Sequence, residues 1–208
     1  MPITESFEGN GCRIECWTIS ESTAELENLC NVNGIATANT FALESRYQQH
    51  MATQLLFNHL FGAGEGLLQY HSTGKPYVYG SELHHVSISH SGVRVTMMKS
   101  GHACGVDIER IHPRVEKVKH KFLNDDELVA VNGAPTFTVV QYWTAKEAMF
   151  KVYGSQEVFM RNNIVVSAVN GDEACAELKD RDLTLKRRIV FRVVDDMLLA
   201  WTEPYETE

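Results

Sequence analysis

The chain has 208 residues, 44% of them hydrophobic and 22% charged, which fits one or two globular units and excludes wholesale disorder. Its formal net charge of −8 argues against a general nucleic-acid binder. No apolar run approaches about 18 residues and no signal peptide is visible, so we expect a cytoplasmic protein without a membrane partner. The five cysteines include no C-x-x-C pair, which argues against a disulfide framework or a structural zinc site.

The first half is predicted to hold one long helix among short strands. Residues 13–19 alternate as a strand, and an acidic helix over 21–29 would follow Ser20 as its cap. A long helix would begin at Thr40, because apolar residues from Leu43 to Leu60 recur at helical intervals, and it would end near Phe61, because glycines follow it. Further strands are expected at 67–70, 77–79, 85–91 and 93–98. In the third of these, Val86 and Ile88 would point inward, and Ser87, Ser89 and Ser91 outward.

The second half repeats this order of elements. A strand is expected at 105–109, and Asn124 with Glu127 reads as a capping box. A helix over 138–153 would end at Gly154. Four more strands are expected at 164–169, 174–178, 188–194 and 197–202. The chain is therefore predicted to be an α+β fold of two similar subdomains, 1–103 and 104–208, each a long helix packed on a small antiparallel sheet and related by pseudo-twofold symmetry.

Two carboxylates stand out on the strand at 105–109. Asp107 and Glu109 alternate with β-branched residues, so both should project from one face. Such a pair indicates either a solvated edge or a site for a divalent cation. On the helix, Glu147 and Lys151 lie one turn apart, as an ordinary surface pair would, or as groups delivered to the same place.

Positive charge is concentrated in one segment. Residues 1–74 contain only two Lys or Arg residues, Arg13 and Arg46, against eight acids. The twelve residues from Arg110 to Lys121 contain five basic residues: Arg110, Arg114, Lys117, Lys119 and Lys121. This basic segment indicates either a docking surface for an anionic partner or a solvated helix face.

Four motifs in this order resemble the 4′-phosphopantetheinyl transferases. They are Gly74-Lys75-Pro76, Ser89-His90-Ser91, Gly105-Val106-Asp107-Ile108-Glu109, and the run from Trp143 through Lys146-Glu147-Ala148 and Lys151 to Gly154. The length is similar to the monomeric, pseudo-dimeric Sfp-type branch. The resemblance implies Mg²⁺-dependent transfer of the phosphopantetheine arm of coenzyme A to a serine of an apo-carrier protein, with release of adenosine 3′,5′-bisphosphate.

The resemblance also implies roles for the acidic residues and Lys151. Asp107, Glu109 and Glu147 would hold Mg²⁺, for which carboxylate oxygens are suitable ligands. Glu147 is also the candidate base, acting directly or through a metal-bound water, and Lys151 would steady the pyrophosphate or protonate the leaving group. Glu127 matches an acidic position of the family, although helix capping explains it equally well.

Coenzyme A would be held mainly by the first half. His90, which is also a candidate catalytic residue, and Ser89 match phosphate-contacting positions. Lys75 matches one that reaches the nucleotide, and Arg46 matches one that binds the 3′-phosphate. One departure concerns that phosphate, because residues 14–45 contain no Lys or Arg, where family members carry further basic residues. Three alternatives follow: Arg46 and backbone groups hold the phosphate, the affinity for coenzyme A is reduced, or the chain is a paralogue with another substrate.

The basic segment would then dock the acidic carrier protein. Two rival functions remain: a Mg²⁺-dependent phosphohydrolase or nuclease that uses the same carboxylates, and a non-catalytic coenzyme A-binding paralogue.

Overall fold

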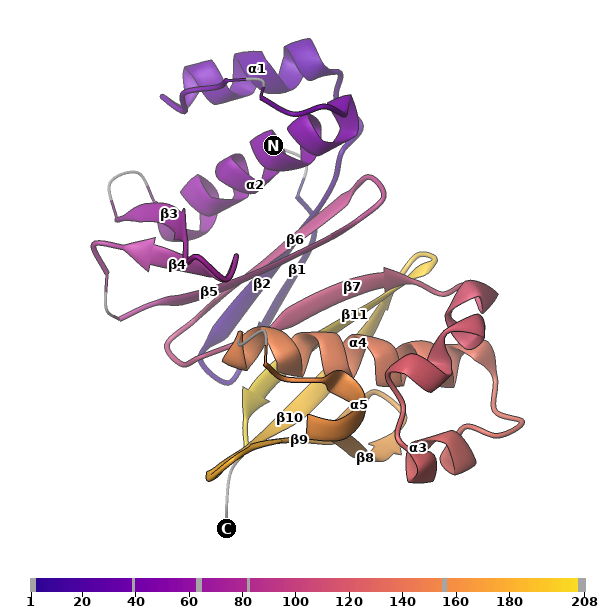
Figure 1. The fold of residues 1–208 in the computed structure, drawn as a ribbon. Coiled ribbons are helices and arrows are strands. Elements are labelled where there is room, and N and C mark those ends of the chain that lie inside the picture. The colour runs from indigo at the N-terminus through magenta and orange to yellow at the C-terminus, as the bar shows by residue number, and fades with distance from the viewer. Residues whose placement is uncertain (1–2, 39, 63–64, 82, 155–156, 206–208) are drawn as a thin grey trace.

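Two antiparallel sheets, each packed against a long helix, form the framework of the chain (Figure 1). The computed structural model describes residues 3–38, 40–62, 65–81, 83–154 and 157–205. The predicted α+β class with two subdomains is confirmed. None of the helices in these ranges combines the length and apolar character needed to cross a membrane.

The first subdomain is a four-stranded sheet in the order β1-β2-β6-β5, with α2 packed on it and α1 packed on α2 (Figure 1). Its elements are β1 (Ile3–Gly9), β2 (Cys12–Thr18), α1 (Thr23–Val32), α2 (Glu44–Phe61), the hairpin β3 (Leu67–Tyr70) and β4 (Pro76–Tyr79), β5 (His85–Ser91) and β6 (Arg94–Ser100). Tyr47, Met51 and Leu55 of α2 are buried in one apolar cluster with Trp17 of β2. This packing explains why the helical spacing of apolar residues correctly predicted the long helix.

Three predictions for the first subdomain were wrong in detail. The edge strand β1 was missed, because Ile3 and Phe7 are only half-buried and give a weak alternating pattern. Ser22 caps α1 in place of Ser20, since its hydroxyl accepts from the Glu25 amide while Glu25 accepts from the Ser22 amide. The long helix begins at Glu44, after Leu43, so the predicted cap at Thr40 does not form.

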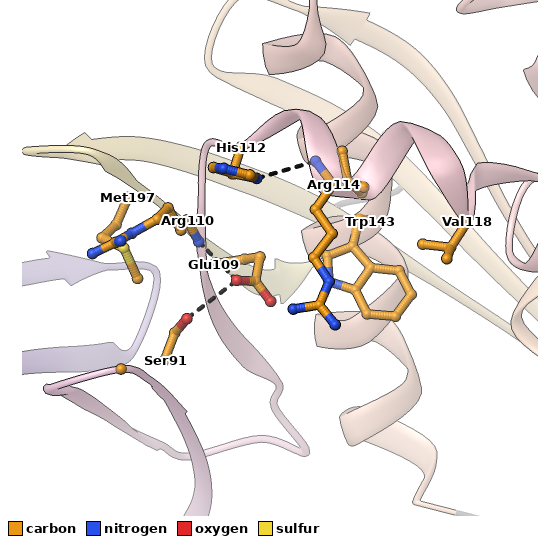
Figure 2. Close-up of a pocket in the computed structure, with 10 residues that line it drawn as sticks. Ser91, Glu109, Arg110, His112, Arg114, Val118, Trp143 and Met197 are labelled. Atoms are coloured by element: carbon orange, nitrogen blue, oxygen red, sulfur yellow. Dashed lines mark hydrogen bonds between the residues drawn. The ribbon is translucent and has the colours of Figure 1, made fainter.

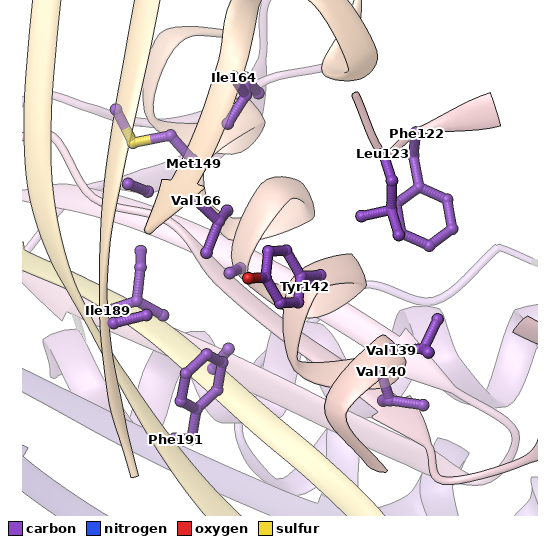
Figure 3. Close-up of a cluster of buried hydrophobic side chains, with 14 of the residues drawn as sticks. Phe122, Leu123, Val139, Val140, Tyr142, Met149, Ile164, Val166, Ile189 and Phe191 are labelled. Atoms are coloured by element: carbon purple, nitrogen blue, oxygen red, sulfur yellow. The ribbon is translucent and has the colours of Figure 1, made fainter. Parts of the chain in front are cut away.

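The second subdomain is a five-stranded sheet in the order β7-β11-β10-β9-β8. Its elements are β7 (Val106–Arg110), the 3₁₀ helices η1 (Pro113–Lys117) and η2 (Lys119–Lys121), α3 (Asp125–Ala130), α4 (Thr136–Tyr153), α5 (Met160–Asn163), β8 (Ile164–Asn170), β9 (Glu173–Asp180), β10 (Leu183–Val194) and β11 (Met197–Pro204). Figure 3 shows Val140 and Met149 of α4 among Ile189 and Phe191 of the sheet. The predicted Asn124 cap and the left-handed Gly154 stop are confirmed.

A third apolar cluster joins the two subdomains. It combines Ile14 and Met98 of the first sheet with Val106, Ile108 and Trp201 of the second. Edge strand β7 consequently runs beside edge strand β5 (Figure 1). Polar residues of two motifs that are far apart in the sequence meet along this seam.

Candidate functional site

The serines of β5 bind the backbone and carboxylates of β7. Ser87 Oγ accepts from the Val106 amide at 3.0 Å. Ser89 Oγ donates to Asp107 Oδ1 at 2.7 Å, and Ser91 Oγ donates to Glu109 Oε1 at 3.1 Å. The prediction that these serines point outward is wrong for Ser87 and Ser89, which are 2% and 7% exposed, because the polar face of β5 packs on the other subdomain instead of facing water.

Asp107 is held by a cation from α4. Lys151 Nζ lies 2.8 Å from Asp107 Oδ1 and donates to the Val106 carbonyl at 2.9 Å. The Asp107 side chain is 8% exposed and the Lys151 side chain 25%. The strand and the helix motif are therefore brought together, and Lys151 neutralises one of the carboxylates.

Glu147 faces the two carboxylates of β7. Burial, followed by the negative charge of Asp107, raises the pKa of Glu147 from 4.5 to about 7; Glu109 adds to the increase and Lys151 opposes it. Three acidic groups thus share a poorly hydrated region with one lysine. A carboxyl with a pKa near neutrality is suited to proton transfer at physiological pH.

The same acidic groups are chemically suited to a hard divalent cation. Carboxylate oxygens are the preferred ligands of Mg²⁺, and a cation would relieve the repulsion that raises the pKa of Glu147. In the present arrangement, however, the described residues contain no group of three or more His, Cys, Asp and Glu side chains positioned to hold a metal. The carboxylates of Asp107, Glu109 and Glu147 are suitable ligands for Mg²⁺, and in this structure Lys151 forms an ion pair with Asp107.

A second polar group lies at the open end of β5. Arg46 Nη1, from the first turns of α2, lies 3.4 Å from His90 Nδ1 and donates to Gln49 Oε1 at 3.1 Å. Desolvation lowers the pKa of His90, and the charges of Arg46 and Lys151 lower it further. These residues border a cavity of about 560 Å³, the Arg46 pocket, together with Phe41, His50 and Tyr70.

Lys75 points away from the Arg46 pocket. Its Nζ donates to the carbonyls of Val152 and Tyr153, and its stem lies against Gly154. A lysine at this position satisfies carbonyl groups at the carboxyl end of α4 and complements the helix dipole. Of the turn that contains Lys75, the residues Gly74 and Pro76 border the Arg46 pocket, whereas Lys75 does not.

A buried ion pair joins α4 to α3. Lys146 Nζ lies 2.6 Å from Glu127 Oε2, with side chains 0% and 3% exposed. Glu127 also accepts from the Asn124 and Val166 amides, so it both caps α3 and pairs with Lys146. Lys146 belongs to one of the predicted motifs but had no predicted role. A lysine between alanines on an apolar helix was the signal for its buried position.

The basic segment borders a cavity of about 550 Å³ beside Glu109. Figure 2 shows Arg110 and Arg114 at this cavity, with Glu109 between them and Trp143 beside Arg114. Val115 and Val118 add apolar surface. This docking cavity therefore combines positive side chains with apolar side chains and opens next to the carboxylates.

One comparison with known proteins gives a match. The family model described as the 4′-phosphopantetheinyl transferase superfamily matches residues 103–200. The matched region includes Asp107, Glu109, Glu147 and Lys151 but stops short of Arg46 and the β5 motif in the first half. No curated protein matches the chain.

Proposed function

We propose that the chain transfers the 4′-phosphopantetheine arm of coenzyme A to a serine of an apo-carrier protein. The observation that carries this proposal is the ion pair of Asp107 and Lys151 between β7 and α4, whose charges also act on Glu147, within a region that matches the transferase superfamily. We further propose that the chain is of the Sfp type, with subdomains 1–103 and 104–208 forming one catalytic unit.

In this proposal the seam binds the pyrophosphate of coenzyme A. Asp107, Glu109 and Glu147 would hold Mg²⁺, which would supply charge neutralisation on the phosphate oxygens. Lys151 stands beside Asp107 and contributes a second positive charge to the same region. Ser89 and Ser91 orient the carboxylates through the hydrogen bonds that they donate.

Glu147 is proposed as the base that accepts the proton of the carrier serine. Burial, the largest cause of its raised pKa, makes this carboxylate a stronger base than an exposed one. The serine oxygen attacks the β-phosphorus, the bond from this phosphorus to the bridging oxygen breaks, and adenosine 3′,5′-bisphosphate leaves. Lys151 is placed to stabilise negative charge on the departing phosphate.

The carrier protein is proposed to dock over the docking cavity. Arg114 and Lys117 are exposed, and the cavity lies next to Glu109, so an acidic partner bound there would bring its serine to the seam. The apolar side chains of Val115, Val118 and Trp143 would be covered in the complex.

The decisive experiment is intact-mass measurement of apo-carrier proteins after incubation with the chain, coenzyme A and Mg²⁺. We expect a carrier to gain the mass of phosphopantetheine. Asp107→Ala should abolish the gain, whereas Asp126→Ala, at an exposed position of α3, should preserve it. Circular dichroism of both variants checks that they are folded.

Two further measurements, of nucleotide release and of coenzyme A binding, separate the rival functions. Release of adenosine 3′,5′-bisphosphate without a carrier would indicate a phosphohydrolase. Binding of coenzyme A without turnover, across acyl and peptidyl carriers, would indicate a non-catalytic paralogue.

A further inference from the structure

A further cavity, the histidine pocket, lies where the two subdomains meet beside the end of α4. Its volume is about 490 Å³. His71, His84 and His85 of the first subdomain border it, together with Cys104 and Tyr153 of the second. None of the described residues that line this pocket is an Asp or Glu. The lining is therefore neutral or positive, in a chain whose formal net charge is −8.

Two cations near this pocket have only neutral partners. Lys75, which borders the pocket, donates to the carbonyls of Val152 and Tyr153. Arg187 donates to a backbone carbonyl through Nη1, and its buried Nε has no hydrogen-bond partner among the described residues. Burial raises the pKa of the Cys104 thiol to about 12, while the charges of Lys75 and Arg187 oppose that rise, so both cations lie near this wall of the pocket. A carbonyl satisfies a donor but leaves its positive charge in place.

The histidines add to this unbalanced positive charge when they are protonated. Burial lowers the pKa of His85, and the charge of Lys75 lowers it further. His102 and His84 act in the same direction. Protonation of one ring therefore disfavours protonation of the next. An anion in the pocket would reverse this effect, because its charge would stabilise the protonated rings.

The donors of the pocket suit a phosphate group better than a metal ion. The described part of the chain has no group of three or more His, Cys, Asp and Glu side chains positioned to hold a metal. Ser72 and Thr73 add hydroxyl groups to the imidazole rings of the lining. A phosphate group offers three acceptor oxygens and a charge of about −1.5 to −2 at neutral pH, so it can accept from several of these donors at once.

We propose that the histidine pocket binds a phosphate-type anion, either inorganic phosphate or the phosphate group of a small metabolite, at a site separate from the seam and from the Arg46 pocket. The bound anion would contact residues of both subdomains and would stabilise their junction. The site is inferred from its own lining and does not depend on the transfer reaction.

Isothermal titration calorimetry with sulfate tests the site, because sulfate remains a dianion at both pH values compared. At constant ionic strength we expect saturable binding at about pH 6.5 and binding about tenfold weaker at about pH 8, since protons are taken up by the histidines together with the anion. Absence of saturable binding at the lower pH, or equal affinity at both, would overturn the proposal.

A double variant locates the anion. His84→Gln combined with His85→Gln should weaken sulfate binding by about tenfold or more, whereas His120→Gln, at an exposed position of η2, should leave it unchanged. Equal affinity in the two variants would place the anion elsewhere and refute the site.

A second measurement does not depend on the folding of the double variant. In the unaltered protein, the imidazole NMR signals of His84 and His85 should shift toward those of protonated rings when sulfate is added. Signals that do not move would count against the site as decisively as unchanged affinity in the double variant.

Competition identifies the source of the anion. Inorganic phosphate and ribose 5-phosphate, a phosphate monoester, should displace sulfate, and the stronger competitor marks the natural class of ligand. Coenzyme A with Mg²⁺ should leave the sulfate in place. Displacement by coenzyme A would show that the histidine pocket belongs to the donor site, and displacement by neither phosphate compound would exclude a phosphate-type ligand.

Discussion

Lys146 supports the helix that carries Glu147 but does not line the site itself. It lies one position before Glu147, on the opposite side of α4 from solvent, and its ammonium donates to the carbonyls of Phe122, Met160 and Ile164. Burial lowers its pKa, and the pair with Glu127 opposes that shift. In this motif, Lys146 therefore stabilises the fold, whereas Glu147 faces the seam.

Removal of the lysine should destabilise the protein strongly. In Lys146→Met, the buried carboxylate of Glu127 loses its counter-charge, so we expect a loss of about 3–5 kcal/mol in the free energy of unfolding, measured by urea denaturation. The control is Lys179→Met in the exposed pair with Glu177, where the lysine side chain is 67% exposed and the expected loss is below about 1 kcal/mol. Equal losses in the two variants would contradict the structural role of the buried pair.

Glu147 should make the stability of the metal-free protein depend on pH. Because its pKa is raised from 4.5 to about 7 in the folded state, unfolding releases a proton between these values, and stability should fall as pH rises through this window. We expect a fall on the order of 2 kcal/mol, measured by urea denaturation in the presence of EDTA.

Glu147→Gln cannot ionise, so the stability of this variant should not fall over that window. Glu8→Gln, at an exposed position of β1, should retain the fall. A profile for Glu147→Gln that matches the unaltered protein would show that another group causes the effect.

The approach of β7 to α4 is the element-scale feature that assembles the seam. A Cβ atom added at Gly105 would lie 1.9 Å from the carbonyl oxygen of Ala148, within the backbone of α4. Gly105 also exchanges hydrogen bonds with Thr202, so it cannot move away freely. A residue without a side chain is needed where the strand that carries Asp107 meets the helix that carries Glu147.

Gly105→Ala should therefore separate the two elements. We expect a loss of about 1–3 kcal/mol of stability and a larger relative loss of transfer activity, because the carboxylates move apart. Gly101→Ala is the matched control, since no atom lies within 4 Å of its added Cβ. Thermal unfolding and the intact-mass assay provide the two measurements, and equal behaviour of the two variants would refute the close-packing argument.

The basic segment forms two short 3₁₀ helices that present their charges outward. Reversing Arg114 and Lys117 together to Glu should raise the KM for the carrier protein and leave the KM for coenzyme A unchanged, because both side chains are exposed and lie away from the Arg46 pocket. Steady-state kinetics with each substrate varied in turn measures this. Equal effects on both substrates, or none, would remove the docking proposal.

At the scale of the whole molecule, the cluster between the sheets makes the two subdomains interdependent. Trp201, Val106 and Ile108 of the second subdomain are at most 3% exposed, and they share a cluster with Ile14 and Met98 of the first. Separation of the subdomains would expose this surface to water. The seam also depends on both, since the serines come from one and the carboxylates from the other.

The chain should consequently unfold as one unit. Scanning calorimetry is expected to show a single transition whose calorimetric and van't Hoff enthalpies agree. Two resolved transitions would show that the subdomains are stable independently. A well-folded isolated fragment 104–208 would give the same contradiction.

The local pattern of the sequence predicted most elements, and the resemblance of four motifs to a known family supplied the candidate site residues. Helical spacing of apolar residues predicted α2, the glycine stop at Gly154 marked the end of α4, and alternation predicted β5 and the strand of Asp107 and Glu109. These signals are reliable because they arise from the side chains of one element, each facing a single core. Edge strand β1 was missed because its half-buried residues give only a weak alternating pattern. The cap at Ser22 was missed because the sequence does not distinguish it from the nearby Ser20.

Only the tertiary structure decided what the side chains contact. It turned the serines of β5 toward β7, directed Lys75 to the end of α4, and paired Lys146 with Glu127. The local pattern cannot distinguish a polar face that meets water from one that meets another subdomain, because both require the same residue types. The packing of one sheet edge against another made that choice, and with it the geometry of the site.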